Sequence, residues 1–218
     1  MNSVANAFLI AVVVVFKWAV SRGLVKSNPT TGVARQSWKT NGIHTWTVEQ
    51  IEQFRKHFPI GTKERLALEM MLFLGLRRSD VIRVGAQHIK DGVMSIQTQK
   101  TGVHVHIPLS PALKACIDAT PLGDEVFLTT SYGKTFLSPV SFSAWFKTQC
   151  KKAGLPPECG CHGLRKAGAT ILANSGASAY ELMAMYGWSQ SSMAEIYTKE
   201  SDRKKLAVST IDLLAKNI

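Results

Sequence analysis

Four residues in the segment CGCHGLRKAG (159–168) could serve either of two kinds of chemistry. Cys159, Cys161 and His162 are ligand types for a soft metal such as zinc. His162 and Arg165 are instead three residues apart, the spacing at which two side chains meet on one face of a helix. At a helix start, free backbone N–H groups and the positive dipole end favour an anion, so this pair is suited to holding a phosphate.

The metal interpretation meets two obstacles. The two cysteines of this segment are separated by a single residue, which is tighter than the spacing usual within a structural zinc ligand pair. A second pair is missing, because Cys116 and Cys150 are isolated, and His104 and His106 alternate with apolar residues as the polar side of a half-exposed strand. We therefore expect no metal site and no cofactor.

The phosphate interpretation gains weight from residues elsewhere in the chain. Arg77 follows the predicted end of a helix, and Asp80 comes three residues later. Lys100 lies on a predicted β-turn, Trp188 follows a glycine that stops a helix, and Tyr197 comes nine residues after Trp188. Each residue alone has an ordinary structural explanation, but such explanations do not account for all of them in this order.

With these residues the chain resembles the tyrosine recombinases, the phage-integrase family. The matching stretches, which follow the order of the family over roughly 44–217, are GLRRSDVIRV (75–84), QKTGVHVHIPL (99–109), HGLRKAGAT (162–170) and YGWSQSSMAEIYTK (186–199). The segment SRGLVKSNPTTGV (21–33) is similar to the passage from the core-binding domain of the family into its catalytic domain. The resemblance implies a residual core-binding helix (1–26), a linker (27–43) and a catalytic domain (44–218).

The resemblance also implies a role for each matched catalytic residue. Tyr197 would be the nucleophile, and Arg77 and Arg165 would clamp the phosphate. Lys100 would be the general acid. His162 would be the general base or an orienting hydrogen-bond partner. Two guanidiniums suit this task because their planar, forked donors match the non-bridging phosphate oxygens.

Other positions would support the reaction or the binding of DNA. Asp80 would hold the site from behind. Trp188 departs from the family pattern, in which His is commoner. Its indole N–H donates one hydrogen bond but cannot shuttle a proton. The residues expected to contact DNA are Arg78, Lys151, Lys152, Lys199 and Arg203, with Lys204 and Lys205 beside them.

Charge and composition agree with a nucleic-acid partner. The 218 residues include 26 Lys and Arg against 15 Asp and Glu, a formal charge of +11. Such a balance favours a polyanion, and binding through phosphates is expected to weaken with salt. The apolar run 7–16 is shorter than the roughly 20 residues of a membrane span, so we expect a buried helix, no signal peptide and no membrane partner. Four cysteines then indicate reduced thiols in the cytoplasm.

The elements that must position these residues are mostly helical. Thr47 opens a capping box, and Ser110-Pro111 and Ser138-Pro139 each mark a helix start. Further helices are predicted over 4–22, 63–74, about 163–176, 178–187, around Tyr197 and over 202–216. Asp91-Gly92 predicts a hairpin, followed by strands 93–97 and 103–107. The predicted fold is α+β, mainly α-helical, with a small three-stranded antiparallel sheet.

Taken together, these features favour a DNA strand transferase for site-specific recombination, from a prophage or another mobile element. Double-stranded DNA is the expected partner. The apolar stripe at 211–214 either docks on its own domain or, as the family implies, joins protomers into a tetrameric synapse on DNA. Two alternatives stay open at this point: a type IB topoisomerase, and a DNA-binding remnant without catalytic activity.

Overall fold

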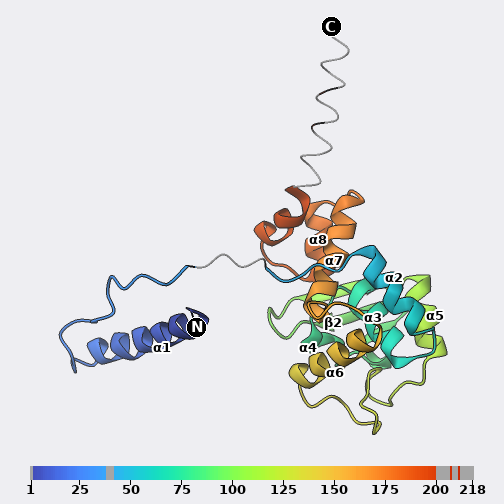
Figure 1. Ribbon diagram of the computed structural model, residues 1–218, viewed down its shortest axis with the longest axis horizontal. Coiled ribbons are helices and arrows are strands. Elements are labelled where there is room, and N and C mark those ends of the chain that lie inside the picture. The colour runs from blue at the N-terminus through green and yellow to red at the C-terminus, as the bar shows by residue number, and fades with distance from the viewer. Residues whose placement is uncertain (1, 38–41, 200–206, 208–210, 212–218) are drawn as a thin grey trace. The chain divides into compact units, whose positions relative to one another are not determined.

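The chain divides into two compact units, Met1–Gly42 and Ile43–Ile218. The computed structural model describes residues 2–37, 42–199, 207 and 211 (Figure 1). The predicted helix 202–216 therefore lies outside the described residues, apart from Ala207 and Ile211, which are helical. Arg203, Lys204 and Lys205 also lie outside them.

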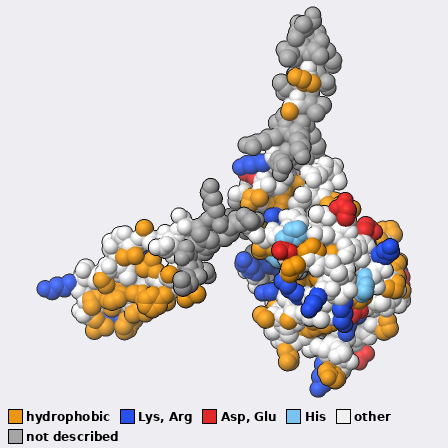
Figure 2. All heavy atoms as spheres, in the orientation of Figure 1, with side chains coloured by type: hydrophobic (Ala, Val, Ile, Leu, Met, Phe, Trp, Pro, Cys, Tyr) orange, Lys and Arg blue, Asp and Glu red, His pale blue; other side chains and the backbone are white. Residues whose placement is uncertain are grey.

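The first unit consists of α1 (Asn2–Ser21) and the segment that follows it. Asn6 fixes this segment, because its side chain exchanges two hydrogen bonds with the backbone of Gln36, at 2.9 and 3.0 Å. Apolar side chains cover much of the helix surface in Figure 2, and the exposed ones include Val4, Phe8, Val14, Val15 and Trp18.

The expectation that this helix is buried is wrong. Ala19 is its only buried hydrophobic residue among those described. The stretch Val4–Ser21 is also long and apolar enough to cross a membrane, by length and composition alone. The uninterrupted apolar run 7–16 is shorter than this stretch, because a single lysine and a few small residues do not end an apolar helix. A helix that packs against other protein meets the same criteria.

The second unit is mainly helical with one small antiparallel sheet, in the order β1-β2-β3, which confirms the predicted fold class. Its elements are α2 (Val48–His57), α3 (Lys63–Phe73), α4 (Arg78–Val81), the 3-10 helix η1 (Ala86–His88), β1 (Ile89–Lys90), β2 (Val93–Gln97), β3 (His104–Pro108), α5 (Pro111–Ala119), α6 (Pro139–Lys152), α7 (Cys161–Asn174) and α8 (Ala179–Tyr186). Residues 191–199 form a further helix. Helix α3 packs against α5 and α7, and α8 packs against α7 and β3.

Local signals in the sequence set most of these boundaries. The hydroxyl of Thr47 accepts a hydrogen bond from the backbone N–H of Gln50, whose side chain in turn accepts from the N–H of Thr47. Asp91 and Gly92 both adopt positive φ, +52° and +74°, as a two-residue hairpin turn between β1 and β2 requires. Helix α7 begins at Cys161, slightly before the predicted start, and so includes His162.

An aromatic ladder forms the centre of the core and fixes the start of α7. The ring of Phe54 in α2 lies 6.0 Å from that of Trp46 and 5.4 Å from that of Phe146 in α6. The indole N–H of Trp46 donates to the carbonyl of Gly160, the N-cap of α7, at 3.1 Å. At Gly163 the carbonyl of the segment before α2 comes so close that a Cβ has no room.

A buried carboxylate joins α2 to α3. Glu69 is 1% exposed and accepts from Arg55 at 2.8 and 2.7 Å and from Arg65 at 2.6 Å. Helix α3 leads directly into the segment that carries Arg77, so this ion cluster fixes one wall of the site described below. A carboxylate buried this deeply depends on its partners to offset the loss of water.

We predict that Glu69→Gln destabilises the fold by about 3 kcal/mol, because two guanidiniums lose their buried counter-charge. Urea unfolding measures this change. Glu52→Gln is the matched control: Glu52 also pairs with Arg55, at 2.7 Å, but its side chain is 59% exposed, so its loss should cost less than about 1 kcal/mol. Equal effects of the two substitutions would contradict the proposed importance of the buried ion cluster.

Candidate active site

One cleft of the second unit, about 650 Å³ in volume, contains four of the predicted catalytic residues. They are Arg77, Lys100, His162 and Arg165. They come from the segment after α3, the turn between β2 and β3, and the first turns of α7. Residues far apart in the sequence therefore share one cavity.

The cleft is strongly basic. Its lining includes five Lys or Arg residues and one acidic residue, Glu158. On the face of the second unit shown in Figure 2, several blue Lys and Arg side chains lie near one another. A concave surface lined with one sign of charge concentrates ligands of the opposite sign, so the cleft is suited to a phosphate backbone.

Arg165 is the most constrained residue of the cleft. It is 6% exposed, and its guanidinium donates to the carbonyl of Gly75 and, at 2.8 Å, to the carbonyl of Tyr186. Tyr186 is the last residue of α8, where the helix dipole gives partial negative charge, and Gly75 directly follows Leu74, the C-cap of α3. Burial, followed by the charge of Arg77, lowers the pKa of Arg165 to about 10, so the side chain stays charged at neutral pH.

Arg77 presents a free donor. It is the N-cap residue of α4, and it is half-buried. Its Nη1 atom is buried and has no hydrogen-bond partner within the described part of the chain. A buried donor without an acceptor is costly unless a ligand satisfies it, and a phosphate oxygen would do so.

His162 is the second residue of α7 and lies at the mouth of the cleft. Much of its surface reaches solvent, but burial of the remainder lowers the pKa of its imidazole. The charges of Arg165, Arg77, Arg78 and Lys100 lower it further. The ring is therefore held neutral at physiological pH, the state in which one ring nitrogen accepts a proton.

The turn that carries exposed Lys100 is anchored by Asp80. The carboxylate of Asp80 is fully buried, and its Oδ1 atom accepts from the backbone N–H of Gln99 at 2.8 Å. The Nη1 atom of Arg83 lies 3.7 Å from the same oxygen. Asp80 thus holds the residue next to Lys100 without reaching the cleft itself.

Tyr197 joins the site through Trp188. The two rings stack at 5.4 Å with planes 7° apart, and the Trp188 ring lies 5.8 Å from the Arg165 guanidinium carbon. Tyr197 is half-buried and is not among the residues that line the cleft. Burial raises the pKa of its phenol, and the charge of Arg165 opposes that rise.

The cysteines have a structural environment. All four are buried, and burial raises the pKa of Cys150 to about 12 and those of Cys159 and Cys161 to about 11. They are therefore protonated thiols at neutral pH, whereas zinc binds the thiolate. Among the described residues, no group of three His, Cys, Asp or Glu side chains is arranged to hold a metal ion.

Only one of the described residues predicted to contact DNA lines the cleft. Arg78 lines the cleft and donates to the hydroxyl of Ser143 in α6 at 2.8 Å. Lys151 and Lys152 are exposed at the end of α6, outside the cleft lining. Lys199 is exposed, with its Nζ atom 3.7 Å from Glu195.

Several residues of the cleft wall were not predicted from the sequence, among them two polar residues of α6. Ser143 and Lys147 both line the cleft from α6. They are four residues apart, on the face next to that of buried Phe142 and Phe146. That helical spacing was visible in the sequence, but nothing indicated that this face turns toward the arginines.

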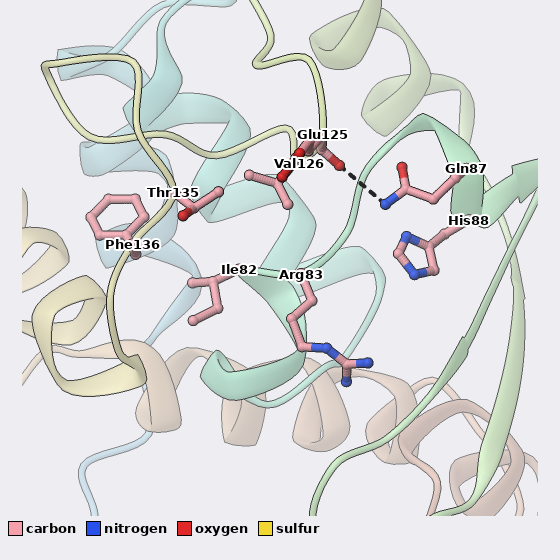
Figure 3. A pocket seen from close by; sticks show the side chains of 8 residues that line it. All are labelled: Ile82, Arg83, Gln87, His88, Glu125, Val126, Thr135 and Phe136. Atoms are coloured by element: carbon pink, nitrogen blue, oxygen red, sulfur yellow. Dashed lines mark hydrogen bonds between the residues drawn. The ribbon is translucent and has the colours of Figure 1, made fainter.

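A second hollow, of about 670 Å³, contains none of the predicted catalytic residues (Figure 3). In Figure 3 His88 is one of its lining residues, and the amide of Gln87 donates to the backbone carbonyl of Glu125 at 3.1 Å. Arg83 donates to the carbonyl of Gln97 at 3.3 Å, so it braces β2 from outside the cleft.

Comparison with known proteins fits this arrangement. Residues 43–204 match the model of the phage integrase family. The chain belongs to the phage integrase family. The family match covers every residue of the cleft and also Trp188 and Tyr197.

Individual members of the family show the same likeness. The chain is 30% identical over 158 residues to the tyrosine recombinase XerD of Xanthomonas axonopodis pv. citri (strain 306), covering 64% of this chain and 52% of that protein. It is 25% identical over 176 residues to the integrase of Escherichia phage HK022, covering 73% and 48%. The chain thus spans about half the length of these curated relatives.

A solved structure shares the fold. A lambda integrase (75-356) dimer bound to a COC' core site superimposes with a TM-score of 0.76 at 21% identity, covering 88% of this chain and 74% of that one. The fold therefore persists although most positions differ in sequence.

We predict that Asp80→Ala loosens the turn that carries Lys100. The substitution removes a charged acceptor from the N–H of Gln99, at a cost of roughly 1.5–3 kcal/mol. The amide of Gln99 should exchange its hydrogen faster. Asp118→Ala, which removes only an exposed pair with Lys114, should leave that rate unchanged. Unchanged exchange at Gln99 in Asp80→Ala would refute the anchoring role.

Proposed function

We propose that this chain cuts and rejoins DNA strands through a covalent phosphotyrosine, as a site-specific recombinase or integrase of a prophage or other mobile element. The observation that carries the proposal is the joint placement of the arginines, His162 and Lys100 in one basic cleft, with Tyr197 connected to Arg165 through Trp188. The roles below are those that family membership implies.

In the cleavage step, the phenolic oxygen of Tyr197 attacks the scissile phosphorus while its proton passes to the neutral imidazole of His162. Arg77 and Arg165 hold the non-bridging oxygens and balance the charge that develops on them. The bond from phosphorus to the 5′-oxygen breaks, and Lys100 supplies the proton that makes it a hydroxyl. The products are a 3′-phosphotyrosine and a free 5′-hydroxyl.

Rejoining is the same step in reverse. The 5′-hydroxyl of a second DNA strand gives its proton to Lys100 and attacks the phosphotyrosine, and Tyr197 leaves with a proton from His162. The number of phosphoester bonds is unchanged, so exchange of strands needs no external energy source. Trp188 contributes a ring contact and one N–H donor to this cycle, but no proton transfer.

Arg165 also favours the ionised form of the nucleophile. A phenol has a pKa near 10, so Tyr197 attacks well only when its oxygen loses the proton. Burial disfavours the phenolate, and the neighbouring guanidinium favours it. The basic cleft is suited to stabilising the phenolate, and the neutral His162 is suited to accepting its proton.

We further propose that residues 1–26 end a core-binding domain, that 27–43 link it to the catalytic domain (44–218), and that the protein acts in the cytoplasm without a membrane. The exposed apolar side chains of α1 support its assignment to a core-binding domain, because one helix cannot bury its own apolar surface. Assembly on DNA through the C-terminal segment is part of the proposal, supported by the solved integrase dimer with the same fold.

A suicide DNA duplex with a nick beside the scissile phosphate tests the activity directly. The short 5′-hydroxyl strand diffuses away after cleavage, so the covalent complex accumulates and survives denaturation. We expect capture by the wild-type chain and none by Tyr197→Phe, which lacks the attacking oxygen but should bind DNA equally well.

Tyr180→Phe is the matched control, because Tyr180 lies on α8 and is 79% exposed. It should capture DNA like the wild type. A gel shift without any wild-type capture would instead favour a DNA-binding protein without catalytic activity. Capture by Tyr197→Phe would refute the assignment of the nucleophile.

A further inference from the structure

Tyr186, the last residue of α8, is buried in a position that no family role accounts for. It is 1% exposed, and its hydroxyl is buried without a hydrogen-bond partner within the described part of the chain. Its ring fills the space left by two glycines. A Cβ on Gly75 would lie 2.8 Å from the ring, and a Cβ on Gly168 would lie 2.7 Å from the hydroxyl.

Tyr186 contacts Arg165 in two ways. Its carbonyl accepts from one guanidinium nitrogen at 2.8 Å, and its ring faces the guanidinium carbon at 4.9 Å. The hydrogen bond to the carbonyl sets the direction of the guanidinium. The ring contact supports the plane of the guanidinium, because a cation is attracted to an aromatic face. Gly75, which borders the same ring, supplies the other carbonyl acceptor of Arg165.

The same ring begins a stack that reaches Tyr197. Tyr186 lies 4.9 Å from Trp188 with planes 22° apart, and Trp188 lies 5.4 Å from Tyr197 with planes 7° apart. Three near-parallel rings therefore connect the buried end of α8 to the predicted nucleophile. Aromatic rings have only two side-chain torsions, so each ring in such a stack restricts the next at small entropic cost.

We propose that Tyr186 is a positioning residue for DNA cleavage: it fixes the guanidinium of Arg165 directly and the ring of Tyr197 through Trp188. This role rests on the proposed function. Trp188 cannot transfer a proton, so its ring, held by Tyr186, contributes position in place of acid–base chemistry. Tyr186 itself touches neither the phosphate nor any reacting atom.

Simple core packing is the alternative explanation, and the two make different predictions. A packing role would affect stability alone, and it would be shared by any buried ring of the second unit. A positioning role would lower the cleavage rate of folded protein while DNA affinity is retained, because a shift of about 1 Å in a reacting group can cost about 10²-fold in rate. It would also require the ring and not the hydroxyl.

The test is single-turnover capture on the nicked suicide duplex, measured per folded molecule, beside DNA affinity at the same salt concentration. We expect Tyr186→Leu to slow capture about 10²-fold with affinity within about twofold of wild type. Tyr186→Phe keeps the ring and should capture at the wild-type rate. Phe127→Leu, which removes a buried ring from the segment between α5 and α6, should lower stability without slowing capture.

A second pair of variants tests the role even where Tyr186→Leu does not fold. Gly168→Ala places a methyl group against the Tyr186 hydroxyl, so it should displace the ring and slow capture. Combining it with Tyr186→Phe removes the obstructing oxygen and should restore the rate. Rescue of this kind is not expected if Tyr186 only fills space.

The outcomes separate the two proposals. Capture by the wild-type chain together with equal rates in Tyr186→Leu and Phe127→Leu would overturn the role of Tyr186 and leave the proposed function intact. Failure of Tyr186→Phe to rescue Gly168→Ala would also overturn it. Absence of capture by the wild-type chain would overturn the proposed function and this role with it.

Discussion

The burial of one charged side chain governs the arrangement of the second unit. A guanidinium as deeply buried as that of Arg165 is tolerated only if fixed dipoles replace the water it loses. The residue after the C-cap of α3 and the last residue of α8 provide them, through the carbonyls of Gly75 and Tyr186. Three helices distant in sequence therefore meet at Arg165, and moving any one of them would leave a buried charge or a helix end unsatisfied.

Because carbonyls and not carboxylates pair with Arg165, the cleft contains little negative charge. The carbonyls contribute partial charges only, and the sole acidic residue of the lining, Glu158, faces five basic ones. Arg77 has an unpartnered donor within the described part of the chain, and the cations of the cleft add to the effect of burial in lowering the pKa of His162. A phosphodiester, the proposed ligand, would supply the missing negative charge.

The sequence predicted those features that depend on neighbouring residues. Capping at Thr47 and Ser138, the turn at Asp91-Gly92 and the resulting place of Lys100 follow from local chemistry, and the structure contains them. Contacts between distant elements were not predictable in this way. The face of α6 that carries Lys147, the bond from Asp80 to Gln99, and the ring stack from Tyr186 to Tyr197 depend on how the helices pack. The length of α1 was predicted closely, as 4–22 against Asn2–Ser21, but its exposure was not, because burial depends on what the helix packs against.

The central claim is that the forked guanidinium of Arg165, and not its charge alone, makes the cleft a catalytic site. Arg165→Lys tests it most directly, since an ammonium keeps the charge but cannot reach two carbonyls and a phosphate in one plane. Single-turnover capture of nicked DNA by folded Arg165→Lys should fall by about 10²–10³-fold, as expected for the loss of a preorganised donor. Capture at the wild-type rate would contradict the account.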